Sequence, residues 1–345
     1  MGRFQLVKSQ WGNVFLIIII SQVLLGCSSI QKMTINAAAE PFWNLGSHQQ
    51  KRASWFQTKN SMPAQIEIVE GLLSQTPNNT DYLALAIKGN VAYSLLILET
   101  EYLREEWQKE WKPETFKNSE INYRENYHSL ALYHYGMALK HAHAFFKERD
   151  LDYNHLLEKL NDEKHLKSML DDHLKSTDME IETLFFIGMS LALSINLNKK
   201  NLKLVAQLPL SKFFVDWACD KNPNLYDGSC DLFNGMYLVS RPKMLGGNPE
   251  MGENIFKNAM KKHPHNWLIH WFYVQFVLLP KGEQEEYLKV SELSKSWQTD
   301  WDACYFFVPT EKETDFCKEN SLMRLFQSTA LERFHLIKHF QDKLF

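Results

Sequence analysis

The chain has 345 residues, of which 45% are hydrophobic and 13% aromatic, and its formal net charge is −3. So apolar a chain can bury a large core. Its slightly acidic balance lacks the basic face that nucleic acids require, which excludes nucleic acid as a partner. No Pro-, Ser- or Gly-rich linker divides the chain, so we expect a single folded unit after any targeting segment.

The chain begins with a segment typical of exported proteins. Arg3 and Lys8 precede an apolar run over residues 14–26, which is shorter than the roughly 20 residues that a membrane-spanning helix needs. A positive start, a short apolar centre and a small residue before the end predict a signal peptide over residues 1–26. The alternatives are a plain signal peptide or an N-terminal membrane anchor.

The residues that end this segment indicate the type of signal. The sequence Leu-Leu-Gly-Cys-Ser ending at Ser28 resembles the bacterial lipoprotein signal, in which Cys27 becomes the lipidated first residue. Two or more acyl chains would anchor the protein stably. Because Cys27 is followed by Ser rather than Asp, we expect the anchor in the outer membrane, facing the periplasm.

The rest of the chain predicts helices. Residues 27–61 indicate a lipid-anchored tether leading into a first helix, and residues 62–345 a helical repeat domain. Apolar residues recur there with helical spacing, and no strand pattern competes. The expected helices cover residues 63–77, 81–103, 123–149, 178–196, 211–222, 249–262, 266–280, 283–297 and 319–345, with a charged loop and one short helix between residues 147 and 178.

Several of these helices share one pattern of proline and glycine. Helices end at Pro77, Pro223 and Pro264, and Gly89 and Gly235 each stand twelve residues after the first two of these prolines. Glycine inside a helix costs about 1 kcal/mol relative to alanine, so its recurrence suggests places where another helix approaches closely. The order helix, Pro turn, helix with internal Gly is typical of tetratricopeptide (TPR) repeats. We therefore predict an all-α fold, an array of helical hairpins with degenerate TPR-like repeats.

The most specific stretch is the turn within residues 239–264. Pro242 ends one helix, and Gly246 and Gly247 can take left-handed backbone angles. Asn248 can then cap a new helix that has Pro249 at its first position. This turn chemistry predicts how two helices pack against each other, but it performs no reaction.

The cysteines fit an oxidising compartment. With Cys27 lipidated, an even number remains: Cys219 and Cys230 flank one turn, and Cys304 and Cys317 flank a polar loop. We predict one local disulfide in each pair. The alternative is four buried thiols.

The aromatic residues offer candidates for a binding groove. Trp267 and Trp271 are four residues apart, and Tyr135 lies on another predicted helix. Such side chains could line a groove for an apolar ligand or a partner protein. The competing interpretation is that they fill the core.

The chain carries none of the common catalytic motifs. It has no HExxH, GxSxG, phosphate-binding loop or CxxC pair. We therefore predict that the protein is not an enzyme and holds no metal and no cofactor.

The order of these features resembles one known family. The lipoprotein signal, the helix ending in LSQTPNN, the ETLFFIG helix and the stretch from Arg241-Pro242 to Gly246-Gly247-Asn248-Pro249, followed by Phe256 and Ala259, are similar to the T-component (TatT) family of TRAP transporters. The resemblance spans nearly the whole mature chain. It implies an all-helical fold with degenerate TPR repeats, a homotrimer with a central pore and side clefts, and docking of a periplasmic solute-binding protein.

Two functional hypotheses follow. The first is a lipid-anchored periplasmic accessory component of a tripartite ATP-independent (TRAP) transport system, which docks the solute-binding protein and conducts or hands over a small organic or hydrophobic ligand. The alternative is a general TPR-type adaptor lipoprotein for protein-protein assembly in the envelope, with no solute role.

Overall fold

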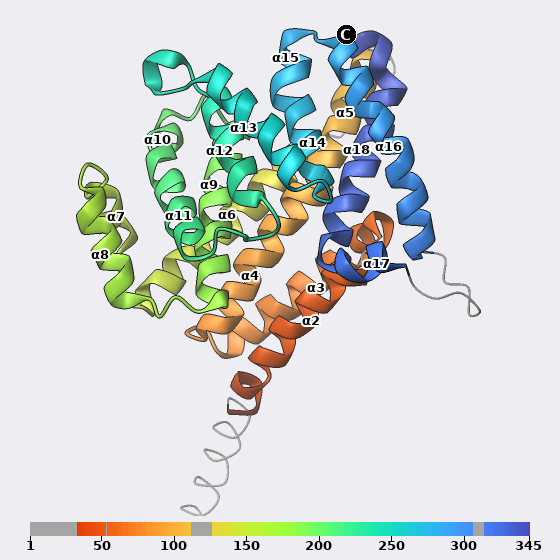
Figure 1. Ribbon diagram of the computed structural model, residues 1–345. Coiled ribbons are helices and arrows are strands. Elements are labelled where there is room, and N and C mark those ends of the chain that lie inside the picture. Colours follow the sequence, from red (N-terminus) through yellow and green to blue (C-terminus); the bar gives the residue numbers. More distant parts are fainter. Residues whose placement is uncertain (1–32, 53, 112–125, 306–313) are drawn as a thin grey trace, which may run out of the picture.

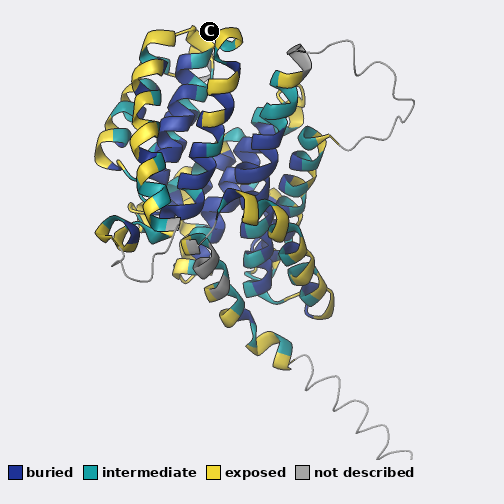
Figure 2. Ribbon diagram, turned by 90° about the vertical axis from the view of Figure 1, so that its right-hand side faces the viewer, coloured by how far each residue is buried: buried dark blue, intermediate teal, exposed yellow. Residues whose placement is uncertain are grey.

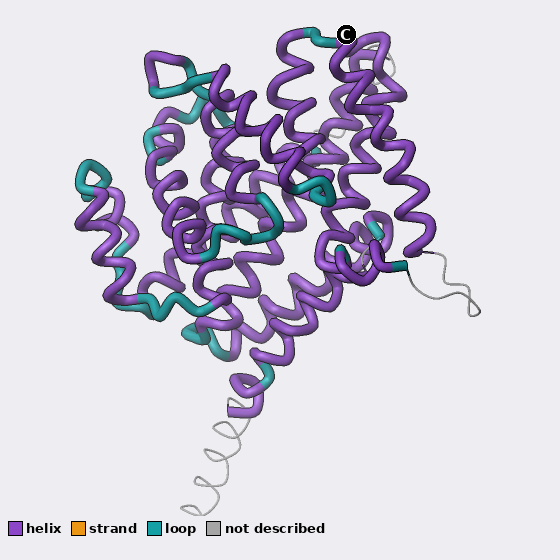
Figure 3. The backbone as a smooth tube through the Cα atoms, in the orientation of Figure 1, coloured by secondary structure: helices purple, strands orange, loops and turns teal. Residues whose placement is uncertain are grey.

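A computed structural model of the chain describes residues 33–52, 54–111, 126–305 and 314–345 (Figure 1). The predicted signal peptide and the lipidation site Cys27 lie outside the described residues. The polypeptide in the described part is helical with short connections, and it contains no β-strand (Figure 3). The predicted all-α class is confirmed, while the TPR-like repeat arrangement stays a prediction.

The helices differ from the expected ones mainly at their ends. Their bounds are α2 (Ala39–Arg52), α3 (Trp55–Gln75), α4 (Thr80–Tyr93), α5 (Glu99–Trp111), α6 (Tyr127–Lys147), α7 (Tyr153–Glu158), α8 (Glu163–His173), α9 (Asp178–Leu197), α10 (Leu202–Val205), α11 (Leu208–Lys221), α12 (Ser229–Val239), α13 (Pro249–Lys262), α14 (Trp267–Tyr273), α15 (Leu279–Lys281), α16 (Gln284–Tyr305), α17 (Asp315–Glu319) and α18 (Arg324–Leu344). The boundary expected between residues 61 and 62 falls inside α3, and the charged stretch 147–178 contains two short helices, α7 and α8.

Neighbouring helices pack side by side across the molecule. Helix α4 contacts α3, α6 and α9, α9 packs on α11, and α12 packs on α13. The pair α7 and α8 lies at one edge of the molecule, and α16 and α18 lie toward the other (Figure 1). Buried residues concentrate on the central helices, whose neighbours shield them from solvent (Figure 2).

Within the described residues, two central helices are long and apolar enough to cross a membrane. One is Thr80–Gln108, a continuous segment that contains α4 and most of α5, and the other is Asp178–Leu197, which is α9. In each, 83% of the apolar window is buried inside the fold. Their hydrophobicity is therefore explained by the protein core that they build.

Glycines permit close contact between helices, as the sequence suggested. A Cβ at Gly188 in α9 would lie 2.6 Å from Cγ2 of Val215 in α11. At Gly235 in α12, it would lie 3.0 Å from the Phe256 ring in α13. At Gly89 the nearest atom is at an ordinary contact distance of 3.5 Å. The expected close approach therefore occurs at Gly235 but not at Gly89.

One turn of π-helix, Ser94–Leu98, joins α4 to α5. A π-helical turn leaves backbone carbonyls without their usual helical partners. Side chains from other helices donate to two carbonyls of this turn: Trp55 Nε1 donates to Leu96 O at 2.9 Å, and Arg333 donates to Leu95 O. The irregular turn therefore ties α3 and α18 to the central helix.

Both cysteine pairs expected from the sequence are joined in the structure. The sulfur atoms of Cys219 and Cys230 are 2.06 Å apart, and those of Cys304 and Cys317 are 1.95 Å apart. The first pair links the end of α11 to the start of α12, and the second links the end of α16 to α17. We expect each crosslink to restrict the unfolded chain locally.

Candidate functional site

A cavity of about 290 Å³ lies between α2, α3 and α4, and we call it the α2–α3–α4 cavity. Most of its wall is apolar, with amide and hydroxyl groups contributed by α2 and α3. The residues that line it are Phe42, Gly46, Gln50, Gln57, Thr58, Ser61, Met62, Gln65, Ile66, Ile68, Val69, Leu85, Ala86, Lys88, Gly89, Ala92 and Leu325. Lys88 is the charged residue among them.

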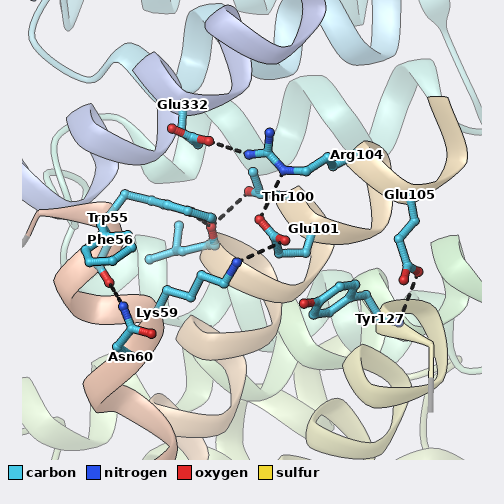
Figure 4. A network of polar contacts seen from close by, with 11 residues as sticks. Trp55, Phe56, Lys59, Asn60, Thr100, Glu101, Arg104, Glu105, Tyr127 and Glu332 are labelled. Atoms are coloured by element: carbon cyan, nitrogen blue, oxygen red, sulfur yellow. Dashed lines mark hydrogen bonds and ion pairs between the residues drawn. The ribbon is translucent and has the colours of Figure 1, made fainter. Parts of the chain in front are cut away.

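The wall formed by α3 is fixed at its N-terminal end. Ser54 caps the helix by accepting a hydrogen bond from Gln57 N at 3.1 Å. The Trp55 indole is 8% exposed, and its hydrogen bond to Leu96 O anchors this end of α3 to the central helix. One turn later, Lys59 Nζ lies 3.0 Å from Glu101 Oε2 (Figure 4).

Arg104 extends this network to the C-terminal helix. Its guanidinium lies 3.3 Å from Glu101 Oε1 and forms an ion pair with Glu332 of α18 (Figure 4). Helices α3, α5 and α18 are thus joined by one chain of alternating charges. Because Lys59, Arg104 and Glu332 are each about one-third exposed, the network orients the cavity wall more than it stabilises the fold.

The wall formed by α2 is held by its connection to α4. Tyr82 Oη donates to Ile35 O at 2.5 Å, and Asn79 Nδ2 donates to Asn36 Oδ1 at 2.9 Å. The ring of Phe42, which lines the cavity, contacts the ring of Tyr82 edge-on. The residues before α2 are thereby fixed to the start of α4.

Lys88 reaches the cavity from the middle of α4. It is 8% exposed, and its ammonium lies 2.6 Å from Glu182 Oε2 of α9. The ring centroids of Trp43 and Tyr226 are 4.6 and 5.6 Å from the same nitrogen, close enough for cation–π attraction. A carboxylate and aromatic faces therefore hold this buried cation in place.

Glu182 accepts a second hydrogen bond at the oxygen that faces Lys88. Tyr226 Oη donates a hydrogen bond to Glu182 Oε2, the oxygen that also faces Lys88. Burial raises the pKa of Tyr226 well above its ordinary value, and the neighbouring Glu182 carboxylate raises it further. The phenol therefore stays protonated at neutral pH and remains a donor to Glu182.

The turn predicted within residues 239–264, which we call the central turn, lies between α12 and α13. Gly246 has a left-handed backbone with φ of +84°, as predicted. Gly247 does not, and it is needed for a different reason: a Cβ there would lie 1.9 Å from Arg241 O. Asn248 caps α13 by accepting from Met251 N at 3.0 Å, and Pro249 is the first residue of that helix.

The remaining residues of the turn motif have structural roles in α12, the turn and α13. The Arg241 guanidinium lies 4.6 Å from the Tyr237 ring and donates to its hydroxyl oxygen. Pro242 lies between the end of α12 and a short 3₁₀ turn that begins at the next residue. Phe256 and Ala259 are buried on the face of α13 that packs on the neighbouring helices. Arg241 and Pro242 belong to the turn and its approach, Phe256 and Ala259 to the packed face of α13, and none of the four lines the cavity.

Replacing Gly247 by Ala is expected to lower the free energy of unfolding by about 1–3 kcal/mol. The new methyl group cannot occupy the position of Arg241 O, so the turn must shift. Urea unfolding followed by circular dichroism measures the change. Met244 in the same turn is 90% exposed, and Met244→Ala should change stability by less than about 0.5 kcal/mol. Equal values for the two variants would contradict the assigned role of Gly247.

The three aromatic residues considered for a groove are buried. Tyr135 and Trp271 are 0% exposed and Trp267 is 1% exposed. None of them lines the α2–α3–α4 cavity. Trp267 stacks on Trp297 with ring centroids 4.9 Å apart, and Tyr135 donates to Glu99 Oε1 at 2.6 Å. Their packing is that of core residues.

Sequence reasoning missed the cavity and its cation. The sequence did contain one signal, because Lys88 is the single charged residue in the apolar run YLALAIKGNVAYSLLIL (residues 82–98), next to Gly89. A charged residue in such a helix is expected to have a partner. That partner, Glu182, is 94 residues away in the chain, a distance over which residue spacing carries no information.

Comparison with known proteins identifies the family. No curated protein matches the chain significantly. A family model described as TRAP transporter T-component matches residues 58–304, which run from the beginning of α3 to the end of α16. The match includes most of the cavity wall and the whole central turn. Because it covers well over half of the sequence, the chain belongs to the TRAP transporter T-component family.

Proposed function

We propose that this protein is a lipid-anchored periplasmic accessory component of a TRAP transport system, in which it docks the solute-binding protein and hands over a small organic or hydrophobic ligand. Cys27 would carry the lipid and place the chain on the outer membrane. The working form would be a homotrimer. The chain would act by binding, without catalysis.

The observation that carries this proposal is the family match over residues 58–304. Membership associates the chain with a TRAP transport system and suggests a location in the cell envelope. The family is an accessory component of transport and is not known as an enzyme. The lipoprotein-like sequence ending at Cys27 and Ser28 supports the finer placement.

The docking role predicts saturable binding to a solute-binding protein of the TRAP type from the same organism. Isothermal titration calorimetry with the chain from Ser28 onward, which leaves out the lipidation site Cys27, measures it. A periplasmic binding protein of another transporter class, at the same concentration, is the control and should give no heat of binding. Equal binding of both proteins, or of neither, would overturn the transport role and favour the general adaptor.

A further inference from the structure

We infer that the α2–α3–α4 cavity binds an uncharged, mainly apolar molecule that carries an oxygen atom near one end, such as an alcohol, ester or ketone with a hydrocarbon chain. The body of the ligand would lie against the apolar wall, and its oxygen would accept a hydrogen bond from Lys88. This inference deepens the proposed function and rests on it, because the transport role supplies the reason for binding a ligand. The binding itself is measured on the protein alone.

The wall of the cavity favours a hydrocarbon body. Met62, Ile66 and Val69 line it from α3, Leu85 from α4 and Leu325 from the start of α18. Apolar surface removed from water contributes roughly 25 cal/mol per Å² to binding or folding. A volume of about 290 Å³ is near the lower end of the roughly 300–1,000 Å³ typical of ligand pockets. The ligand is therefore a small molecule and not a peptide.

The charges at the cavity decide the nature of the polar end. Lys88 is paired with Glu182 at 2.6 Å, so the pair carries no net charge. An anionic ligand would have to compete with Glu182 for the ammonium while losing its own hydration, which is costly in an apolar site. A cationic ligand would meet the Lys88 ammonium directly. An uncharged end avoids both penalties.

Lys88 can still donate a hydrogen bond to such a ligand. An ammonium has three N–H donors, and in the described part of the chain Glu182 is its hydrogen-bond acceptor. The aromatic faces of Trp43 and Tyr226 fix the nitrogen without accepting a conventional hydrogen bond. An oxygen acceptor on the ligand is therefore the group that complements this end of the cavity.

Competition between ligands that differ only in the head group tests the inference. The chain from Ser28 onward is loaded with the uncharged fluorophore N-phenyl-1-naphthylamine and titrated at pH 8 with decanol, decanoate or decylamine. We expect decanol to displace the fluorophore at a concentration at least about tenfold below that of either charged analogue, a factor that corresponds to about 1.4 kcal/mol. Equal displacement by all three, or preference for a charged head, would overturn the inference.

A pair of glycine variants locates the binding. Gly46 in α2 lines the cavity, and a Cβ added there meets nothing within 4 Å. We expect the larger side chain of Gly46→Leu to reduce the space open to a ligand. Gly71 in α3 also has open space around it but does not line the cavity, so Gly71→Leu is the matched control. We expect Gly46→Leu to weaken fluorophore and decanol binding at least tenfold and Gly71→Leu to leave both unchanged.

The outcomes separate this inference from the proposed function. Binding that survives in Gly46→Leu, with unchanged thermal unfolding, would place the ligand elsewhere and overturn the inference. If decanol binds as expected but the solute-binding protein does not dock, the cavity assignment stands and the transport role fails. If the solute-binding protein docks but decanol does not bind, the transport role stands and the cavity inference fails.

Discussion

Replacing Arg333 by Met is expected to lower the free energy of unfolding by about 3–5 kcal/mol, the usual result of removing one partner from a buried charge network. Arg333 is 0% exposed in α18. Its Nε donates to Thr100 Oγ1 at 2.8 Å, and a terminal nitrogen donates to Leu95 O in the π-helical turn. Met would retain the apolar packing but lose the charge and both hydrogen bonds.

The loss should depend on pH because of Glu99. Burial raises the pKa of Glu99, whereas Arg333 and the hydrogen bond from Tyr135 act to lower it. The net pKa in the folded state is higher than that of an unfolded Glu, about 4.3. The folded state therefore binds more protons, and the contribution of Glu99 to stability falls as pH rises from about 4.3 toward the raised pKa. Without Arg333 this pKa rises further, so Arg333→Met should cost more at pH 8 than at pH 5.

Urea unfolding of wild type and Arg333→Met at these two pH values measures both effects. Lys338 lies on the same helix and is exposed, so Lys338→Met is the control and should change stability by less than about 0.5 kcal/mol at either pH. A loss below 1 kcal/mol for Arg333→Met would contradict the stabilising role assigned to Arg333. A loss that grows toward pH 5 would contradict its electrostatic effect on Glu99.

The second large effect is expected at the contact between α9 and α11. Gly188→Ala should lower the free energy of unfolding by about 1–3 kcal/mol through overpacking. The added Cβ would lie 2.6 Å from Cγ2 of Val215 and 2.8 Å from Ser211 O. A backbone oxygen cannot rotate away as a flexible side chain can. The shift would also disturb the hydrogen bond from Ser211 Oγ to Gly188 O, which is 2.8 Å long.

The same substitution elsewhere should have the opposite sign. Gly136 in α6 has no atom within 4 Å of an added Cβ, so Gly136→Ala should raise stability by about 0.5–1 kcal/mol through helix propensity alone. Thermal and urea unfolding of both variants provide the comparison. If both alanines stabilise the protein, the helices at Gly188 are farther apart than described.

Local features could be predicted from the sequence because they depend on nearby residues. Asn248 and Pro249 begin α13 as capping preferences require, and Gly246 takes the left-handed angle expected of it. The close contact at Gly235 followed from the cost of glycine in a helix. Gly247 has a different role because the path of the chain brings Arg241 O against it, which the local sequence does not reveal.

The cavity could not be predicted because its parts come together only in the folded chain. Lys88 meets Glu182 across 94 residues, and Arg104 meets Glu332 across 228. Helical periodicity tells which face of a helix is apolar but not which helix covers that face. For the same reason Trp267 and Trp271 could be proposed as groove residues, whereas α16 and α18 bury them through Trp297 and Phe334.

The central claim, that this T-component docks a solute-binding protein as a homotrimer, is tested most directly by light scattering. The mass in solution is measured for the chain from Ser28 onward, alone and mixed with a solute-binding protein of the TRAP type from the same organism. The account predicts a trimer whose mass increases when the binding protein is added. A monomer whose mass does not change would contradict it.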